Sequence, residues 1–507
     1  MNKSYSYLIK NGNFNIEKFL PQINAISFIG LVYLIFRFIF VAFFQNSYEV
    51  LHIDERIIIN DIYNVWNLDN EFNRYPNVEN DLIKNIYLVI TEFAYGGDLR
   101  YGRIWSNIFI IFLGPFSLFG DQTLITAVRI FTIIIYFISI NLLINLYLNK
   151  NLRWFYCLIF YTIPGVLYFN SVPKPDPFVI FFISIALYYL NEKKYNKSII
   201  FFGIATGVKI VGIFALLLAI IYLLYTKKIT SDFKSIGKTL FYSWLGFVIA
   251  NPVLILPPIS IRNLPNFYSV YYKWIDSQSL YDQEKRFSFD YFQNWLETLS
   301  IHFSYGYIRS EVFSILMIVF FLFFIFKLIS YEKINIAFIS LIGLTHCIFI
   351  IISVQRQWIL YLNYSFIFIF LGLFYFINLK KFRYIYFILF FLIIVPNGLM
   401  KINSSLSARD TSISKEISSI NMVVDRLEDL YENKETKFNV VYWDPSIGMP
   451  RNNVTYQAQF DVRENWEGHD LDYILEFSDF YVTKNDLNLD KYNKFTERDY
   501  FIYTKKN

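Results

Sequence analysis

Residues 25–44 read AISFIGLVYLIFRFIFVAFF, and this apolar run ends shortly before the polar stretch His52-Ile53-Asp54-Glu55-Arg56. A helix of about 20 apolar residues is long enough to cross a bilayer. The adjacent carboxylates of Asp54 and Glu55 therefore lie where a membrane helix enters water, which suits a base that acts on a membrane-borne substrate. The pair is equally typical of an ordinary solvated loop, because acidic side chains are mostly exposed.

The composition of the whole chain indicates a polytopic α-helical membrane protein. The chain has 507 residues, of which 55% are hydrophobic, and its mean hydropathy is +0.37. Apolar runs long enough to cross a bilayer recur as far as Met400. The net charge of +5 gives no reason to expect nucleic acid as a partner. Cys157 and Cys347 both lie in apolar runs, so they indicate neither a disulfide framework nor a zinc site.

Basic residues set the expected topology, because short loops rich in lysine and arginine stay in the cytoplasm. This rule places the N-terminus in the cytoplasm and residues 46–103 and 258–310 in long outer loops. It predicts about eleven crossings, near residues 25–44, 124–147, 154–171, 176–190, 198–208, 210–225, 239–256, 312–329, 335–353, 358–378 and 382–400. Because the short 198–208 piece allows a re-entrant pair over 198–225, that alternative stays open. The apolar stretch 104–119 has no place as a crossing, so we expect it to be re-entrant or interfacial.

The sequence predicts two domains, a transmembrane domain over residues 1–400 and a small soluble α/β domain over residues 401–507. An odd number of crossings places the second domain on the outer face of the membrane. Apolar residues at helical spacing predict a helix over 411–432. Strand-like runs follow at Phe438–Trp443, Val454–Phe460, Phe477–Thr483 and Tyr500–Tyr503.

Several ionisable residues are expected near the outer ends of the spans. An ionised side chain costs about 2.5–3.5 kcal/mol at the centre of a bilayer, so such groups usually face the interior of a helical bundle. The topology brings Arg129, Lys174, Lys209 and Arg356 to one level, with Asp176 beside them. Lys209 or Arg356, taken alone, is also explained by a side chain that extends to the interface without a function.

Together, cations and carboxylates at one interface suggest a reaction on an anionic lipid headgroup. A phosphate leaving group needs its charge neutralised by lysine, arginine or a divalent metal. An acceptor hydroxyl needs a base within hydrogen-bond reach, which the Asp54-Glu55 pair would supply. His346 lies within a span, where a hydrogen-bonded core residue is the more usual finding than a ligand.

A series of motifs resembles the GT-C superfamily of membrane glycosyltransferases, and within it the group of protein O-mannosyltransferases and aminoarabinose transferases. The order and spacing of the motifs carry the resemblance, which covers about residues 30–230. In chain order the motifs are Asp54-Glu55, Leu118-Phe119-Gly120, Ala127-Val128-Arg129-Ile130, Pro164-Gly165, Pro173-Lys174-Pro175-Asp176 and Gly203-Ile204-Ala205-Thr206-Gly207-Val208-Lys209.

The resemblance implies an inverting transfer of a sugar from a polyprenyl-phosphate donor to an acceptor hydroxyl at the outer face of the cytoplasmic membrane. Asp54 would be the general base. Glu55 would orient it or help to hold a divalent metal, the one cofactor that the resemblance gives reason to consider. Lys209 and Arg356 would contact the lipid phosphate. The acceptor would be a glycan, a lipid or a protein.

The remaining predicted site residues follow from the same resemblance. Lys174 and Asp176 would line the donor cavity. The family's His/Lys-Pro-Pro motif is absent, and residues 96–103, GGDLRYGR, stand in its place. Arg100 or Arg103 would then make the phosphate contact that this motif usually supplies.

Two other functions fit the hydropathy. A lipid or polysaccharide transporter would show internal repeats and broken helices in corresponding halves, and we find no convincing repeat between residues 1–225 and 226–400. A catalytically inactive member that acts as an assembly subunit through residues 401–507 is compatible with the whole sequence.

Overall fold

The computed structural model divides the chain into two compact units. The first comprises Met1–Ile39, Ile90–Ile108 and Arg129–Ser404, and the second comprises Phe40–Val89, Phe109–Val128 and Ser405–Asn507. Besides some isolated residues, the structure describes residues 53–66, 102–148, 173–254, 334–353, 362–378, 418–419, 422–431, 438–442, 454–459, 478–484 and 492–506.

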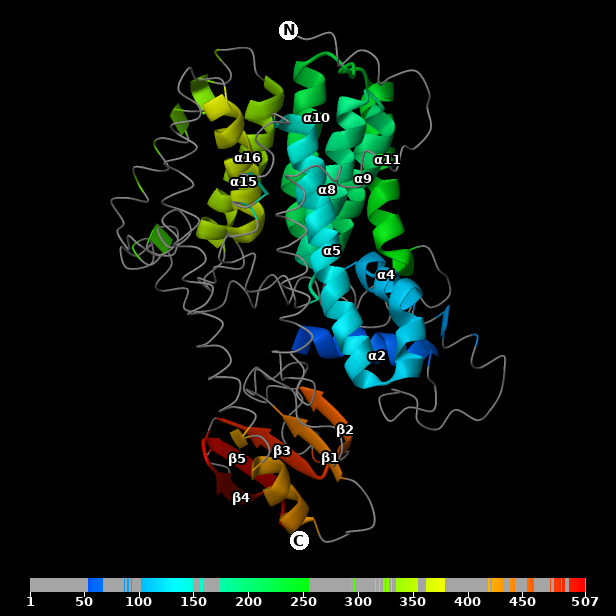
Figure 1. The fold of residues 1–507 in the computed structure, drawn as a ribbon, viewed down its shortest axis with the longest axis vertical. Coiled ribbons are helices and arrows are strands. Elements are labelled where there is room, and N and C mark those ends of the chain that lie inside the picture. The colour runs from blue at the N-terminus through cyan, green and yellow to red at the C-terminus, as the bar shows by residue number, and fades with distance from the viewer. Residues whose placement is uncertain are drawn as a thin grey trace. The chain divides into compact units, whose positions relative to one another are not determined.

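The first unit is a bundle of apolar helices (Figure 1). Helix α9 packs against α8 on one side and α11 on the other, while α10 contacts both α9 and α15, and α15 pairs with α16. The described helices of this unit are the start of α4 (Ile104–Leu113), most of α5 (Asp121–Tyr147), α8 (Pro175–Asn191), α9 (Tyr195–Val208), α10 (Ile213–Tyr225), α11 (Phe233–Ala250), α15 (Ile334–Ser353) and α16 (Asn363–Asn378), with the 3₁₀ turns η5 (Ile210–Gly212) and η6 (Pro252–Leu254).

These bounds fall close to the predicted crossings at 124–147, 176–190, 210–225, 335–353 and 358–378, whereas α11 begins and ends several residues earlier than the predicted 239–256. Within the described ranges, one helix, over Thr123–Tyr147, has the length and the apolar composition of a membrane span. Shorter apolar helical stretches of 10 to 17 residues lie at Ile104–Phe119, Pro175–Asn191, Ile210–Tyr225, Asn335–Ile351 and Tyr364–Tyr375. The number of crossings therefore stays a prediction.

The apolar stretch 104–119 forms helix α4 followed by the 3₁₀ helix η3 (Gly114–Phe119). The ten residues of α4 extend about 15 Å at 1.5 Å per residue, half of a hydrocarbon core of about 30 Å. Pro115 follows Gly114 at the change from α4 to η3, where its missing N–H cannot continue the α-helical hydrogen bonding. With the six residues of η3 the apolar helical stretch runs over Ile104–Phe119, and its re-entrant or interfacial placement stays a prediction.

Helices α9 and α11 approach so closely that glycine is required at their contact. A Cβ atom on Gly203 would lie 2.3 Å from the carbonyl oxygen of Ser243, and one on Gly246 would lie 2.1 Å from the carbonyl oxygen of Ile200. Small residues spaced four apart allow such close backbone contact between apolar helices. This contact fixes the end of α9, which Lys209 follows.

The second unit contains helix α2 (Ile53–Trp66), η3 and a five-stranded sheet. The indole Nε1 of Trp66 donates a hydrogen bond to the carbonyl oxygen of Ile110 at 2.9 Å. A Cβ atom on Gly114 would lie 1.9 Å from that indole nitrogen. The tryptophan thereby anchors α2 against the end of α4 and η3.

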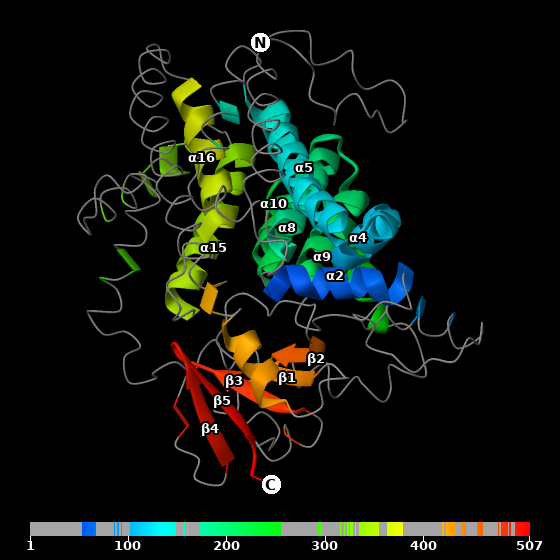
Figure 2. The ribbon, with the colours of Figure 1, turned by 60° about the horizontal axis from the view of Figure 1, so that its bottom comes forward.

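The sheet follows the order β2-β1-β3-β5-β4, with β1 parallel to β2 and β3, and β5 antiparallel to β3 and β4. Figure 2 shows these strands as one twisted layer. The strands are β1 (Phe438–Tyr442), β2 (Val454–Gln459), β3 (Phe480–Thr483), β4 (Tyr492–Glu497) and β5 (Tyr500–Lys505). The sequence predicted four of them within a few residues. Strand β4 was missed, because only alternate residues of YNKFTE are shielded from solvent and the run is largely polar.

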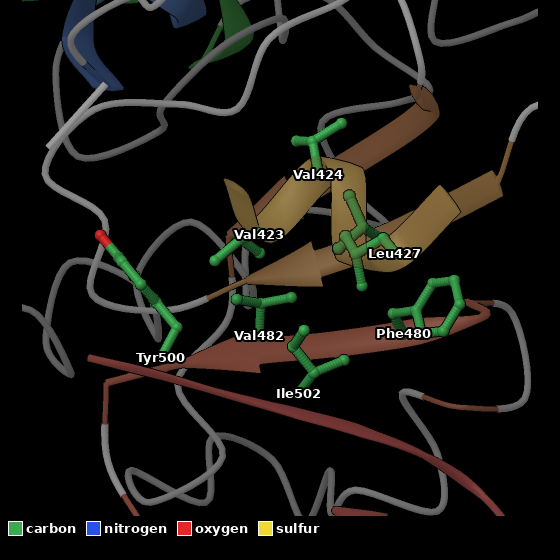
Figure 3. Packing of buried hydrophobic residues seen from close by; sticks show 8 residues of the cluster. Val423, Val424, Leu427, Phe480, Val482, Tyr500 and Ile502 are labelled. Carbon is green, nitrogen blue, oxygen red and sulfur yellow. The ribbon is translucent and has the colours of Figure 1, made fainter. Parts of the chain in front are cut away.

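A helical segment within the predicted 411–432 helix covers one face of this sheet. Val423, Val424 and Leu427 pack on apolar side chains of β1, β3 and β5, among them Val482 and Ile502 (Figure 3). The opposite face carries a second buried cluster, Val441, Leu475, Tyr481, Tyr492 and Tyr503. Residues 401–507 thus contain the helix and strands expected of an α/β domain, while the boundary at 401, its solubility and its side of the membrane stay predictions.

The glycine contact between α9 and α11 predicts a stability difference between two alanine substitutions in α11. Gly246→Ala places a methyl group against the Ile200 carbonyl, so we expect a loss of about 1–3 kcal/mol and a lower apparent Tm. Gly237→Ala is the matched control, because a Cβ atom there meets nothing within 4 Å and alanine favours helix by about 1 kcal/mol. Thermal unfolding of the purified protein in detergent measures both, and equal melting temperatures would contradict the close contact.

Candidate functional site

Lys209 lies at the break between α9 and α10, with an extended backbone (φ −153°, ψ 132°). Its side chain is largely buried, at 9% exposure. The break is closed by a hydrogen bond from the Gly212 N–H to the Lys209 carbonyl at 2.9 Å. A Cβ atom on Gly212 would lie 2.6 Å from the backbone of Ala205, so the chain turns here only with glycine.

Asp176 binds the buried ammonium group of Lys209. The Nζ atom lies 2.8 Å from Oδ1 and 3.0 Å from Oδ2 of this carboxylate. Asp176 is in the first turn of α8, whose N-terminal end is formed by Pro175 and preceded by Lys174 at the N-cap. The partial positive charge of a helix N-terminus stabilises a carboxylate at this position. The ion pair offsets the cost of holding Lys209 away from water.

The residues before α4 contact the turn that carries Lys209. The Gly102 N–H donates a hydrogen bond to the carbonyl of Val208, the residue before Lys209, at 3.1 Å. A Cβ atom on Gly102 would lie 2.3 Å from the Gly207 carbonyl oxygen, so only glycine permits this approach. The next residue, Arg103, is buried at 4% exposure. The ring centroids of Trp105 and Phe178 lie 6.3 Å apart and connect α4 to α8.

The structure therefore brings four predicted site residues to adjoining ends of α4, α8 and α9. They are Arg103, Lys174, Asp176 and Lys209. Two of the three cations, Arg103 and Lys209, are shielded from solvent, whereas the Asp176 side chain keeps 30% exposure. Cationic groups fixed in a largely dry place suit an anion such as a phosphate group.

Asn251 supports the same region and was not predicted from the sequence. It is buried at the end of α11, where its Nδ2 atom donates to the carbonyl oxygens of Gly207 at 3.3 Å and Phe247 at 2.9 Å. The signal in the sequence is the Asn-Pro pair that ends an apolar helix. Its amide holds the end of α11 to the turn that carries Lys209.

Asp54 and Glu55 lie in the first turn of α2. This helix belongs to the second unit, so the participation of both residues in a site with Lys209 stays a prediction. Asp61 of the same helix is fully buried and was also missed. It follows Asp54 by seven residues, two helical turns, so both lie on the same side of α2. Arg356 is outside the described residues.

His346 was expected to be a hydrogen-bonded core residue, and the contact of its Nδ1 atom agrees with that prediction. Nδ1 lies 2.7 Å from the Ser365 hydroxyl, and the residue is 2% exposed. The described residues contain no group of three or more histidine, cysteine, aspartate or glutamate side chains arranged to hold a metal ion. A metal held with Glu55 stays a prediction.

Two comparisons with known proteins bear on this arrangement. Residues 107–353, just under half of the chain, match the family model of Glycosyltransferase family 87. The fold is similar to the crystal structure of ArnT from Cupriavidus metallidurans bound to undecaprenyl phosphate, with a TM-score of 0.53 and 10% sequence identity over 95% of this chain and 98% of that one. No curated protein matches the chain.

These findings show that the chain shares its fold with ArnT and is similar to a family of glycosyltransferases over residues 107–353. The resemblance that the motifs predicted is thereby confirmed. In particular, the chain is similar to Glycosyltransferase family 87 in the part that contains α5, α8 to α11 and α15, and hence the Lys209–Asp176 ion pair.

The ion pair predicts unequal effects of its two single substitutions on stability. Asp176→Asn leaves a buried ammonium group without its counter-charge, a change that typically costs about 3–5 kcal/mol. Lys209→Met leaves a carboxylate that keeps 30% exposure and the N-terminus of α8, so we expect a smaller loss. The double variant should lose less than the sum of the two. Apparent Tm values of the four proteins test this, and additive effects would contradict direct pairing.

Proposed function

We propose that the protein transfers a sugar, with inversion, from a polyprenyl-phosphate-linked donor to an acceptor hydroxyl at the outer face of the cytoplasmic membrane. The Lys209–Asp176 ion pair next to Arg103 carries the proposal. It is a preorganised cationic site at the end of a helix, in a chain similar to membrane glycosyltransferases. The ArnT structure contains undecaprenyl phosphate, and this supports a polyprenyl phosphate as the lipid carrier.

The reaction exchanges one bond for another at the anomeric carbon. The bond from this carbon to the phosphate oxygen breaks, and its electron pair leaves with the lipid phosphate. The acceptor oxygen forms the new bond from the opposite side, and its proton passes to the Asp54 carboxylate. One carboxylate base is enough, because the phosphate needs no proton to leave, unlike the alkoxide leaving group of a glycosidase.

The cationic residues would act on the leaving group. Lys209, Arg103 and Lys174 would neutralise the charge that grows on the phosphate as the bond breaks, and Arg356 would add a further contact. Asp176 holds the Lys209 ammonium at 2.8 Å before any donor binds. The Asp176 side chain keeps 30% exposure, so a phosphate oxygen would approach from the carboxylate's side and share or replace its contact with the ammonium.

The remaining parts of the proposal concern orientation and partners. Glu55 would orient the base or help to hold a divalent metal. The N-terminus would lie in the cytoplasm, and residues 401–507 would lie outside, where they would meet a glycan, lipid or protein acceptor. The two-layer packing of the helical segment 422–430 on the sheet supports an independent unit of this kind.

The assignment of the base predicts a selective loss of transfer activity. In proteoliposomes with labelled undecaprenyl-phosphate sugars, we expect Asp54→Asn to lower the transfer rate by about 100- to 10,000-fold, the usual contribution of a general base. Binding of undecaprenyl phosphate should stay unchanged. Asp232→Asn is the matched control, because Asp232 is the exposed N-cap of α11 and asparagine caps equally well.

Three outcomes separate the alternatives. Full transfer by Asp54→Asn would refute the base assignment while leaving the fold and the donor site intact. A wild type that moves the lipid across the membrane but transfers no sugar would favour a transporter. A wild type that binds undecaprenyl phosphate and does neither would favour an inactive assembly subunit.

A further inference from the structure

A cluster of polar side chains lies between α10, α15 and α16, close to Lys209. His346 of α15 contacts two consecutive residues of α16. Its Nδ1 atom is 2.7 Å from the Ser365 hydroxyl, and its ring meets that of Tyr364 edge to face with centroids 4.5 Å apart. The His346 ring also faces an aromatic residue of α10, since the ring centroids of Phe214 and His346 lie 6.2 Å apart.

Two polar atoms of this cluster have no hydrogen-bond partner among the described residues. They are the Nε2 atom of His346 and the hydroxyl oxygen of Tyr364. The two residues are only 2% and 3% exposed. Buried polar atoms in native proteins are almost always hydrogen-bonded, so an unpartnered pair in one place points to a ligand or a bound water. Two unpartnered polar atoms on rings that contact each other are stronger evidence for a bound molecule than a single one.

The position of the pair relates it to the cationic site. The charge of Lys209 acts electrostatically on the His346 ring. Phe214 belongs to α10, the helix that follows the turn after Lys209, and it packs on Phe349 of α15 with ring centroids 4.7 Å apart. The cluster therefore borders the helix that begins beside the cationic site.

We propose that His346 and Tyr364 form a hydroxyl-binding subsite for the sugar of the donor. This inference rests on the proposed function and adds to it the residues that recognise the sugar. A phenol hydroxyl both donates and accepts, and the free imidazole nitrogen donates or accepts according to the tautomer that the Ser365 bond selects. These capacities match sugar hydroxyl groups, which also donate and accept. The phosphate is served by the cations beside Lys209.

Such a subsite would contribute to specificity. A buried group built to hydrogen-bond a hydroxyl discriminates strongly against a ligand that lacks it, because the protein group is then left unpaired. The surrounding rings of Phe214 and Tyr364 are suited to the apolar C–H faces of a sugar ring. The subsite therefore predicts that the protein distinguishes a sugar-bearing lipid from the bare lipid phosphate.

Tyr364→Phe tests this with the smallest change, because it removes the hydroxyl and keeps the ring against His346. Binding to full-length protein in nanodiscs is measured for undecaprenyl phosphate and for a panel of undecaprenyl-phosphate hexoses and pentoses. For the sugar lipid that the wild type binds best, we expect about tenfold weaker binding, the effect of one buried hydrogen bond. Binding of undecaprenyl phosphate should change less than twofold. Tyr222→Phe is the matched control, since its hydroxyl contacts Asn335 elsewhere along the α10–α15 contact.

The possible outcomes distinguish a failure of the subsite from a failure of the proposed function. Equal weakening of both kinds of lipid, no weakening of either, or a wild type that binds no sugar lipid more tightly than undecaprenyl phosphate would each overturn the subsite. A change in apparent Tm without a change in the ratio of affinities would assign the two polar atoms to a buried water and overturn it as well. A wild type that binds none of these lipids would refute the proposed function itself.

Discussion

The ammonium group of Lys209 lies buried where helix α9 ends, and the carboxylate of Asp176 is its counter-charge. The bidentate contact at 2.8 and 3.0 Å needs α8 to begin beside the point where α9 ends. Pro175 starts α8 at that point, and Gly212 allows the chain to turn after Lys209. The glycine contacts between α9 and α11 hold the same end in place. An ion pair, rather than apolar packing alone, therefore sets the arrangement of this part of the bundle.

On the proposed function, the same pair would prepare the site for an anionic lipid. Burial strengthens the electrostatic action of a cation, and it makes an unpaired cation costly. Asp176 supplies the counter-charge and keeps 30% exposure, so in the proposed reaction a phosphate would share or replace its contact with Lys209. Neutral groups in the neighbouring His346 cluster complement this charged part. A phosphate and the sugar attached to it would thus be recognised by different chemistry in adjacent places.

Much of the cationic site could be predicted from the sequence, because an ionised lysine or arginine within a membrane costs free energy and therefore stands out in an apolar run. Lys209 and Asp176 were named from their positions near span ends and from the order of motifs, and Arg103 was named with Arg100 in place of the family's absent motif. The contact of His346 with Tyr364 and Ser365 was not, because periodicity within one helix does not fix its rotation against another. Asp61 was hidden among isoleucines in a stretch expected to be a loop. Strand β4 was missed because edge strands carry polar residues on their solvent side.

A structure determined by electron cryo-microscopy with undecaprenyl phosphate added to the protein in nanodiscs tests the central claim most directly. We expect density for the lipid phosphate with an oxygen within about 3 Å of the Lys209 Nζ atom, the distance of a charge-assisted hydrogen bond. The Asp176 carboxylate should either share the ammonium with the phosphate or move away from it. A phosphate bound elsewhere, with the Lys209–Asp176 pair unchanged, would refute the role of Lys209 as the phosphate contact.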